Sequence, residues 1–321
     1  MKKHNFDCMQ FIKKIVDFSP RQYAGEIKTA DFIENFLKER KIPFQVQLFK
    51  TKVPIEKKAV LKIDGKSINC KSVCFVSGRI TKKVKILSSR RQIDEFSKTP
   101  AIIFNPDCKG ISCAVFFHNV PAVSVSRKDI SKIKNAKNIQ GEVKIKPISY
   151  TARNILVGNT KNPRSICFAH YDSILTGAWD NAGSNAVLMA NILWHPETLK
   201  NNLFVFTANE ELSYDKKPGY WCRGFRFFEN KYLHLLKNVQ KIIVVDGVGT
   251  HKSYWMKEYK HLWPTILIKN LKKFQPRIIR LGTTSKTADQ FYHSELDNIS
   301  NIKKKYILQT IEKLNKKVNE K

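Results

Sequence analysis

The chain has 321 residues, 42% of them hydrophobic, which suffices for one large α/β domain or for a core with a small second domain. Its net charge of +31 predicts weak, salt-sensitive adhesion to polyanions. No zinc-finger, helix-turn-helix or RNA-binding motif accompanies the charge, so we expect no specific nucleic-acid partner. No apolar run approaches the roughly eighteen residues that span a bilayer. Charged residues interrupt the N-terminal segment where a signal peptide has its apolar core, and seven cysteines fit a reducing compartment, so we expect a cytoplasmic protein.

The chain begins with two helical patterns. Apolar residues recur at helical spacing between Phe6 and Val16, and Ser19-Pro20 ends the pattern. A second helix is predicted over about residues 26–40, and the alternating residues that follow it predict a strand. These elements lead into the body of the chain.

The sequence pattern of residues 51–149 differs from that of the preceding helical segments, because short apolar runs alternate with turn residues. The runs AVLKI (59–63), CFVSG (74–78), VKIL (84–87), AIIF (101–104) and AVFF (114–117) predict strands, and none ends in a cluster of potential ligands. We therefore predict a small β-rich domain over 51–149, inserted into a core formed by 1–50 and 150–321. His118 in this segment is interpreted as a packed histidine rather than a ligand.

Four cysteines of the same segment have two readings. Cys70, Cys74, Cys108 and Cys113 are either two halves of a structural zinc site or buried free thiols. Their spacings are looser than the common pair with two intervening residues, so free thiols are favoured.

Three apolar strands of the core end in residues that bind metals or transfer protons. The run at 166–169 ends in His170, with Asp172 two residues later, and the run at 203–208 ends in Asn209, Glu210 and Glu211. A third run at 242–245 ends in Asp246. A lone His-x-Asp indicates little, but three successive strands with such ends predict a site at the carboxyl edge of an α/β sheet.

Two further candidates come from outside these strands. Asp180 precedes a helical pattern that begins near Ala186, and His293 precedes a C-terminal helix predicted over about 303–318. His251, His261 and Asp289 are nearby alternatives to His293, but none has a similar sequence context.

These residues together resemble the M28 family of zinc aminopeptidases. The matching blocks are AHYDS, GAWDNA, the glutamate pair, VDG and YHSELD, and they agree in order and approximate spacing over residues 154–297. The resemblance implies an α/β fold with a mixed central β-sheet flanked by helices on both faces. Residues 101–133 resemble a protease-associated (PA) domain, and the alternative is an unrelated β-rich insert. Either would form a lid-like appendage beside the substrate cleft.

By this resemblance, the chain holds two zinc ions. Asp180 would bridge them, His170 and Asp246 would complete one site, and Glu211 and His293 the other. Imidazole and carboxylate ligands without thiolate suit catalytic Zn²⁺ and tolerate Co²⁺ or Mn²⁺.

The resemblance also implies catalytic roles beside the metals. Glu210 would act as general base on a metal-bridging water, and Asp172 would accept a hydrogen bond from the free ring nitrogen of His170. Tyr292 would donate to the oxyanion, or would merely pack. Because neighbouring residues of an extended chain point in opposite directions, Glu210 and Glu211 can differ in role only if the backbone turns near Asn209.

The leading functional prediction is a di-zinc aminopeptidase that acts on peptides with a free N-terminus. A glutaminyl-cyclase-like acyltransferase with one zinc is the closest alternative, and a non-catalytic M28-like binding protein is another. The presence of every ligand and of Glu210 argues against the last. Residues 213–228 are interpreted either as a wall of the specificity pocket or as a packed surface loop. No feature of the sequence indicates an oligomeric state.

Overall fold

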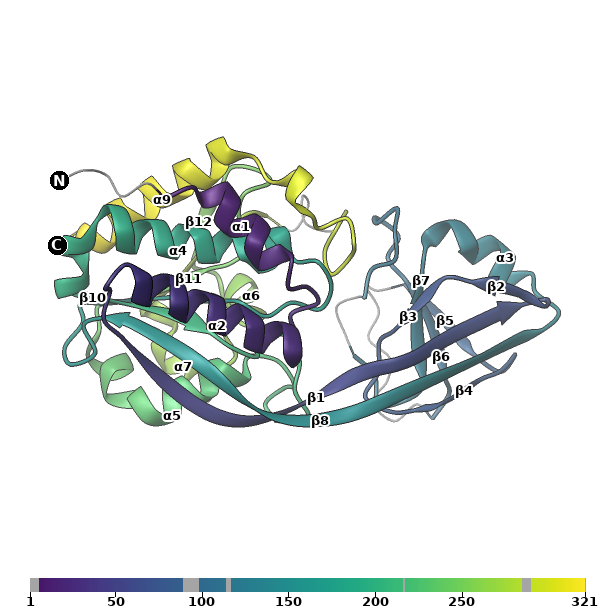
Figure 1. Cartoon of the computed structure of the whole chain (residues 1–321). Helices are drawn as coiled ribbons and strands as arrows, with labels where there is room; N and C mark the ends of the chain where they lie inside the picture. The colour runs from purple at the N-terminus through teal and green to yellow at the C-terminus, as the bar shows by residue number, and fades with distance from the viewer. Residues whose placement is uncertain (1–5, 89–97, 114–116, 216, 285–289, 321) are drawn as a thin grey trace.

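The computed structural model describes residues 6–88, 98–113, 117–215, 217–284 and 290–320. Within these residues the chain folds around two β-sheets (Figure 1). The larger has nine strands in the order β12-β13-β11-β9-β10-β8-β1-β2, with β4 beside β8, and the smaller has the order β3-β7-β6-β5. The described residues contain no helix that is both long and apolar enough to cross a bilayer.

The strands of the larger sheet run in both directions. They are β1 (Phe44–Ile63), β2 (Lys66–Ile68), β4 (Gly78–Ile80), β8 (Ile139–Gly158), β9 (Ser165–His170), β10 (Asn202–Thr207), β11 (Lys241–Val245), β12 (Tyr254–Met256) and β13 (Ile278–Gly282). Strands β10, β9, β11 and β13 are parallel neighbours, whereas β8 and β12 pair antiparallel at either side of them. The sheet is therefore mixed, as predicted.

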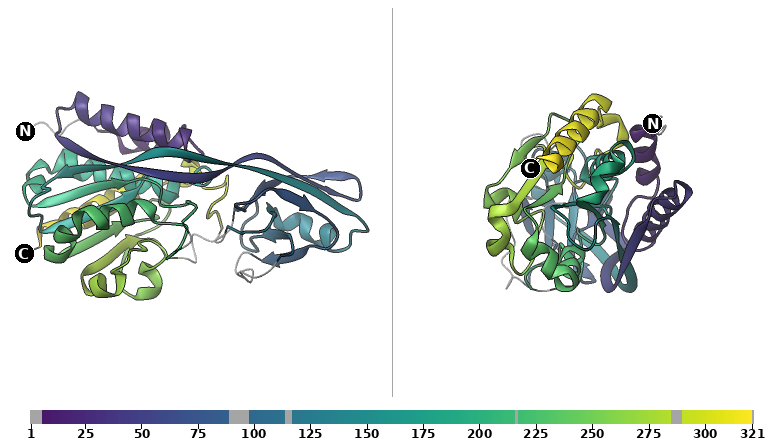
Figure 2. Two further views of the ribbon diagram at one scale, coloured as in Figure 1. Left: turned by 90° about the horizontal axis from the view of Figure 1, so that it is seen from below. Right: turned by 90° about the vertical axis from the view of Figure 1, so that its left-hand side faces the viewer.

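Helices cover both faces of the larger sheet (Figure 2). They are α1 (Cys8–Val16), α2 (Ala24–Glu39), α4 (Gly183–Trp194) and α9 (Lys304–Asn319) on one face, and α5 (Arg223–Asn238), α6 (Tyr259–Leu262) and α7 (Leu271–Phe274) on the other. Alternation along β9 explains how one strand serves both faces: Cys167 packs into the first core, and Ile166 and Phe168 pack into the second. Such strands are apolar throughout because they are buried on both sides.

A ribbon of two long strands connects the sheets. β1 and β8 pair antiparallel from Phe44 with Val157 to Ile63 with Ile139, and Figures 1 and 2 show them running from the larger sheet to the smaller. The described residues of 59–145, here called the small lobe, surround a hydrophobic core of their own. The small lobe holds β3 (Cys70–Ser72), β5 (Lys85–Ser88), β6 (Ala101–Phe104), β7 (Ala122–Val125) and α3 (Ile130–Lys134). The ribbon is continuous through residues 51 and 149, so strand pairing does not change at the predicted domain boundaries.

One predicted strand of the small lobe is wrong. Residues 74–77 do not form a strand, whereas Gly78 begins β4, and Cys74 makes only an isolated bridge to His118. The side chain of Ser77 exchanges hydrogen bonds with the backbone of Ile145, so the backbone pairing with β8 begins only at Gly78. The predicted strands at 84–87 and 101–104 correspond to β5 and β6, whereas residues 114–116 of the AVFF run lie outside the described residues. The PA resemblance stays a prediction.

The two-sided core leads to a first prediction. Phe206 on β10 is fully buried, so Phe206→Ala should lower the free energy of unfolding by about 3–5 kcal/mol. Leu48→Ala is the control, because Leu48 is 64% exposed, and it should change the free energy by less than about 0.5 kcal/mol. Urea unfolding of both variants checks the contrast. Equal losses would contradict the packing described for β10.

Candidate metal centre

The three predicted strand ends meet at one edge of the larger sheet. β9 ends at His170, β10 is followed by Glu210 and Glu211, and β11 is followed by Asp246. Because the three strands are parallel neighbours in the order β11-β9-β10, their carboxyl ends point the same way. The residues that follow them are consequently brought together.

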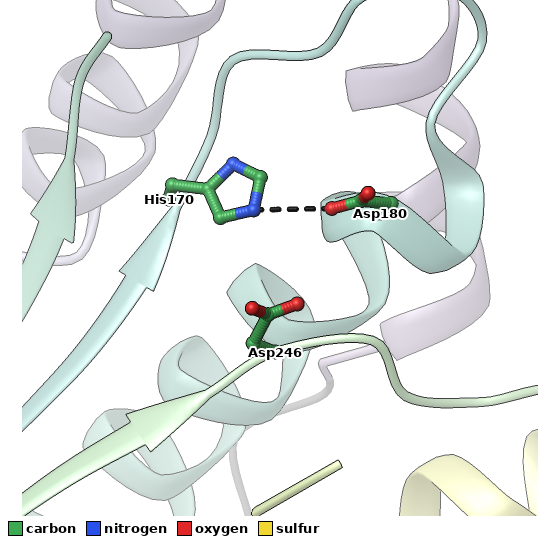
Figure 3. Close-up of side chains that lie close together, drawn as sticks. All are labelled: His170, Asp180 and Asp246. Carbon is green, nitrogen blue, oxygen red and sulfur yellow. Dashed lines mark ion pairs between the residues drawn. The ribbon is translucent and has the colours of Figure 1, made fainter. Parts of the chain in front are cut away.

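One group of potential ligands consists of His170, Asp180 and Asp246. Each offers an atom within 4.8 Å of the others, and all three side chains are buried. His170 Nε2 lies 3.1 Å from Asp180 Oδ1. Figure 3 shows the three side chains converging from the end of β9, the turn before α4 and the end of β11.

A second group contains Asp180, Glu211 and His293, again within 4.8 Å and buried. His293 Nε2 lies 2.9 Å from Glu211 Oε2 and 3.5 Å from Asp180 Oδ2. Asp180 therefore belongs to both groups and turns a different oxygen toward each histidine. All five predicted ligand positions lie together.

Charge in this site is concentrated and buried. Burial disfavours the ionised carboxyl of Asp180, but hydrogen bonds from His170 and His293 outweigh it and keep the pKa of Asp180 below its usual range. For the imidazole of His170, burial opposes protonation, yet Glu210 and the neighbouring aspartates raise its pKa well above the ordinary value. Burial raises the pKa of Glu211 to about 7, although His293 acts in the opposite direction. The cluster of buried carboxylates therefore favours the binding of cations at this site.

Asp172 positions both glutamates. Its Oδ1 accepts the backbone N–H of Glu210 and its Oδ2 that of Glu211, each at 2.9 Å. Asp172 Oδ1 also lies 3.4 Å from Nδ1 of His170, the ring nitrogen that faces away from Asp180. The two groups are neighbours, but His170 Nδ1 has no hydrogen-bond partner among the described residues, so the predicted hydrogen bond is not present. The two bonds to the glutamate backbone were not predicted from the sequence.

The backbone turns at Asn209, as the different roles of the two glutamates require. Asn209 has a φ of +50°, in the left-handed region that asparagine tolerates better than most residues, and its N–H donates to Glu26 Oε2 at 3.1 Å. After this turn, Glu211 reaches His293, whereas Glu210 Oε1 accepts a hydrogen bond from Cys222 Sγ at 2.9 Å. Burial raises the pKa of Glu210 well above its ordinary value.

Tyr292 lies beside this pair. It lines the same pocket as Glu210 and Glu211, and its ring stacks on His293 with a centroid distance of 3.8 Å. Packing against His293 is therefore part of the role of Tyr292. The predicted contact of its hydroxyl with the oxyanion stays a prediction.

Two residues that the sequence analysis missed position the loop that carries Asp180. The buried guanidinium of Arg21 donates to the carbonyl oxygens of Tyr171, Thr176 and Gly177 at 2.7–2.8 Å. Asp297 accepts the N–H groups of Trp179 at 2.6 Å and Asp180 at 3.0 Å. Asp297 belongs to the YHSELD block, so its position in that block was a signal, whereas no role was predicted for Arg21.

The small lobe contacts the segment that carries His293. Ser112 Oγ donates to the carbonyl oxygen of Tyr292 and the Cys113 N–H to that of His293, both at 2.7 Å. A residue of the small lobe thus bonds the backbone of a candidate ligand.

The alternative residues lie elsewhere. His251 stacks near Tyr306 and His261 belongs to α6, and neither joins a potential metal-binding group among the described residues; Asp289 lies outside them. His118 is buried, and burial lowers its pKa to about 4, which fits a packed histidine. Cys74, Cys108 and Cys113 are buried free thiols and Cys70 is a half-buried one, as favoured.

Residues 213–228 combine a pocket wall with a helix. Tyr220 and Trp221 line the pocket beside Glu210, in agreement with the first interpretation. The alternative of a surface loop is wrong for the last residues, because α5 begins at Arg223 and buries Phe225 and Phe228 in the second core.

Neither a family model nor a curated protein sequence matches the chain. Solved structures match over almost its whole length. The zinc aminopeptidase BSAP from Bacillus subtilis has a TM-score of 0.68 at 16% identity, covering 96% of this chain and 92% of that one. A peptidase M28 precursor from Shewanella amazonensis gives 0.66 at 12% identity, covering 97% and 92%. A glutaminyl cyclase from Porphyromonas gingivalis gives 0.53 at 14% identity, covering 97% and 96%. The chain has the same fold as these three proteins, and the predicted fold class, a mixed central sheet with helices on both faces, is confirmed.

The role of Arg21 can be tested by substitution. Arg21→Met leaves three buried carbonyl groups without their donor and removes a cation from an acidic site, so it should lower the free energy of unfolding by about 3–5 kcal/mol. The control is Arg127→Met, because Arg127 is exposed and its guanidinium donates only to the carbonyl oxygen of Pro106 at the surface, and it should cost less than about 1 kcal/mol. Urea unfolding measures both. A loss for Arg21→Met no larger than that of the control would exclude the assigned role.

Proposed function

We propose that the chain is a di-zinc aminopeptidase that removes N-terminal residues from peptides. The observation that carries this proposal is Asp180, whose Oδ1 faces His170 while its Oδ2 faces His293. A carboxylate shared by two imidazole-containing groups suits a pair of metal ions with a bridging ligand. The likeness to the zinc aminopeptidase of Bacillus subtilis and to an M28 peptidase supports the same assignment.

The donor set fits zinc. Asp180 would ligate both ions, His170 and Asp246 one of them, and Glu211 and His293 the other. Two histidines with carboxylates and no thiolate suit catalytic Zn²⁺, with Co²⁺ or Mn²⁺ as substitutes. Glu211 Oε1 is buried and has no hydrogen-bond partner among the described residues, which is expected of an atom that ligates a metal.

The surrounding residues supply the remaining chemistry. Zinc ions, when bound, polarise the peptide carbonyl and lower the pKa of water. Glu210 lines the pocket beside the ligands, so its carboxylate takes a proton from the attacking water and passes it to the leaving amine. Asp172 orients the backbone of Glu210, and the Tyr292 hydroxyl donates to the oxyanion.

A single-zinc glutaminyl cyclase is the second candidate, because the fold is also similar to that of the Porphyromonas gingivalis glutaminyl cyclase. The two ligand groups, which have Asp180 in common, favour the aminopeptidase. A single zinc ion would leave either Glu211 and His293 or His170 and Asp246 without a metal. Metal content and reaction product separate the two candidates.

The decisive assay uses free and N-acetylated aminoacyl-p-nitroanilides with zinc or cobalt, and again with a chelator. We expect release from the free-amine substrates alone, lost with the chelator and restored by metal. Cyclisation of peptides with N-terminal glutamine, without any release from the anilides, would replace the proposal by the cyclase. The absence of both reactions in metal-loaded protein would favour the non-catalytic binding protein.

Two variants test the residues. Glu210→Gln should retain two zinc ions per chain and lose about 10²–10⁴-fold in kcat, because it removes the base but no ligand. Asp180→Ala should lose metal and activity together, because it removes the shared ligand. Plasma mass spectrometry measures the metal content. Glu197→Gln, at an exposed glutamate, is the control and should match the unmodified protein. Near-normal turnover of Glu210→Gln, or full metal content of Asp180→Ala, would contradict the assigned roles.

A further inference from the structure

A pocket lies beside the candidate metal centre. Glu210, Glu211 and His293 form one end of it. The rest of the lining is aromatic or aliphatic, from Phe117, Ile174, Tyr220, Trp221, Trp263 and Pro264, with Tyr292 next to His293. The pocket therefore joins a carboxylate-rich end to apolar walls.

Three separate parts of the chain build the apolar walls. Phe117 comes from the small lobe, Tyr220 and Trp221 precede α5, and Trp263 follows α6. Their rings contact in series, with centroid distances of 6.4 Å from Phe117 to Tyr220, 5.3 Å from Tyr220 to Trp221 and 5.6 Å from Trp221 to Trp263. A continuous aromatic surface results.

The lining of the pocket disfavours substrates with a charged side chain. The chain carries a net charge of +31, yet no lysine or arginine lies among the described residues that line this pocket. An acidic or a basic side chain of the substrate would have to give up its hydration against the aromatic walls. An ammonium group near the carboxylates and an apolar side chain against the rings match both ends.

Hydrogen bonds on two sides of the pocket hold the small lobe, and with it Phe117, against the rest of the molecule. The N–H of Phe117 donates to Tyr220 Oη, and Tyr214 Oη donates to the carbonyl oxygen of Phe75, each at 2.9 Å. Ser112 bonds the backbone of Tyr292 on the other side. Phe117 is thereby positioned relative to the core.

We propose that this pocket binds a large apolar side chain, above all an aromatic one, of the N-terminal residue of the substrate, and that Phe117 makes the small lobe a determinant of this specificity. The inference rests on the proposed aminopeptidase function, which puts a free amino group at the carboxylate end. Burying a phenylalanine rather than an alanine side chain favours the former by on the order of 100-fold.

The test compares kcat/KM for the p-nitroanilides of phenylalanine, leucine, alanine, lysine and glutamate in zinc-loaded protein. We expect phenylalanine to exceed alanine by about 100-fold, and lysine and glutamate to be poor substrates. Phe117→Ala and Trp263→Leu should each lower the ratio of phenylalanine to alanine by about tenfold. Phe104→Ala, in the same lobe but outside the pocket lining, is the matched control and should keep the ratio.

Binding provides a readout that does not need turnover. Calorimetric titration with L-phenylalaninamide and L-alaninamide should show the same preference, weakened in Phe117→Ala and retained in Phe104→Ala. Circular dichroism establishes that each variant is folded, and Trp263→Leu replaces Phe117→Ala if the latter is not.

The outcomes separate the two proposals. Hydrolysis that is fastest with alanine, lysine or glutamate overturns the specificity and leaves the aminopeptidase. No hydrolysis, but tighter binding of phenylalaninamide that depends on Phe117, supports the pocket and overturns the aminopeptidase. No hydrolysis and equal binding of the two amides overturns both. A phenylalanine preference that Phe117→Ala and Trp263→Leu leave intact overturns the assignment of these walls.

Discussion

The arrangement of the site depends on the position of one buried carboxylate. Asp180 must turn one oxygen toward His170 and the other toward His293, although these histidines lie 123 positions apart in the sequence (293 − 170). Asp297 accepts the backbone N–H groups of Trp179 and Asp180, and Arg21 donates to three carbonyl oxygens of the loop before them. A buried, charged carboxylate is stable only beside protons or cations, so the geometry that buries Asp180 between two histidines also suits a cation at this position.

The sheet explains why the other ligands meet this carboxylate. The central residues of β9, β10 and β11 are apolar because both faces of these strands are buried, so polar residues gather at the ends of the strands. Parallel neighbours end at one edge, and there the chain is free to turn, as Asn209 does between β10 and the two glutamates. Asp172 then spans from the end of β9 to the backbone of Glu210 and Glu211, which ties neighbouring strand ends into one unit.

The long ribbon of β1 and β8 makes the small lobe part of the site rather than a remote appendage. It carries Ser112 to the backbone of Tyr292, and Phe117 to Tyr220. One lobe thereby contacts a candidate ligand segment and a wall of the pocket. Under the proposed function, a change of residue in the small lobe alters the substrate side chain that fits, while the candidate metal ligands, which all come from the larger body, stay the same.

The sequence by itself determined the parts of this protein that depend on local patterns. Apolar runs that end in His170, Glu210 and Asp246 indicated both the strands and the edge at which they meet, because period and burial are encoded within a few residues. Only the tertiary structure decided which distant groups support them. Arg21, Ser112 and Phe117 act through contacts with residues more than 100 positions away, and no periodicity marks such a partner. The absence of a strand at 74–77 also depends on a distant partner, since hydrogen bonds between the Ser77 side chain and the backbone of Ile145 take the place of backbone pairing there.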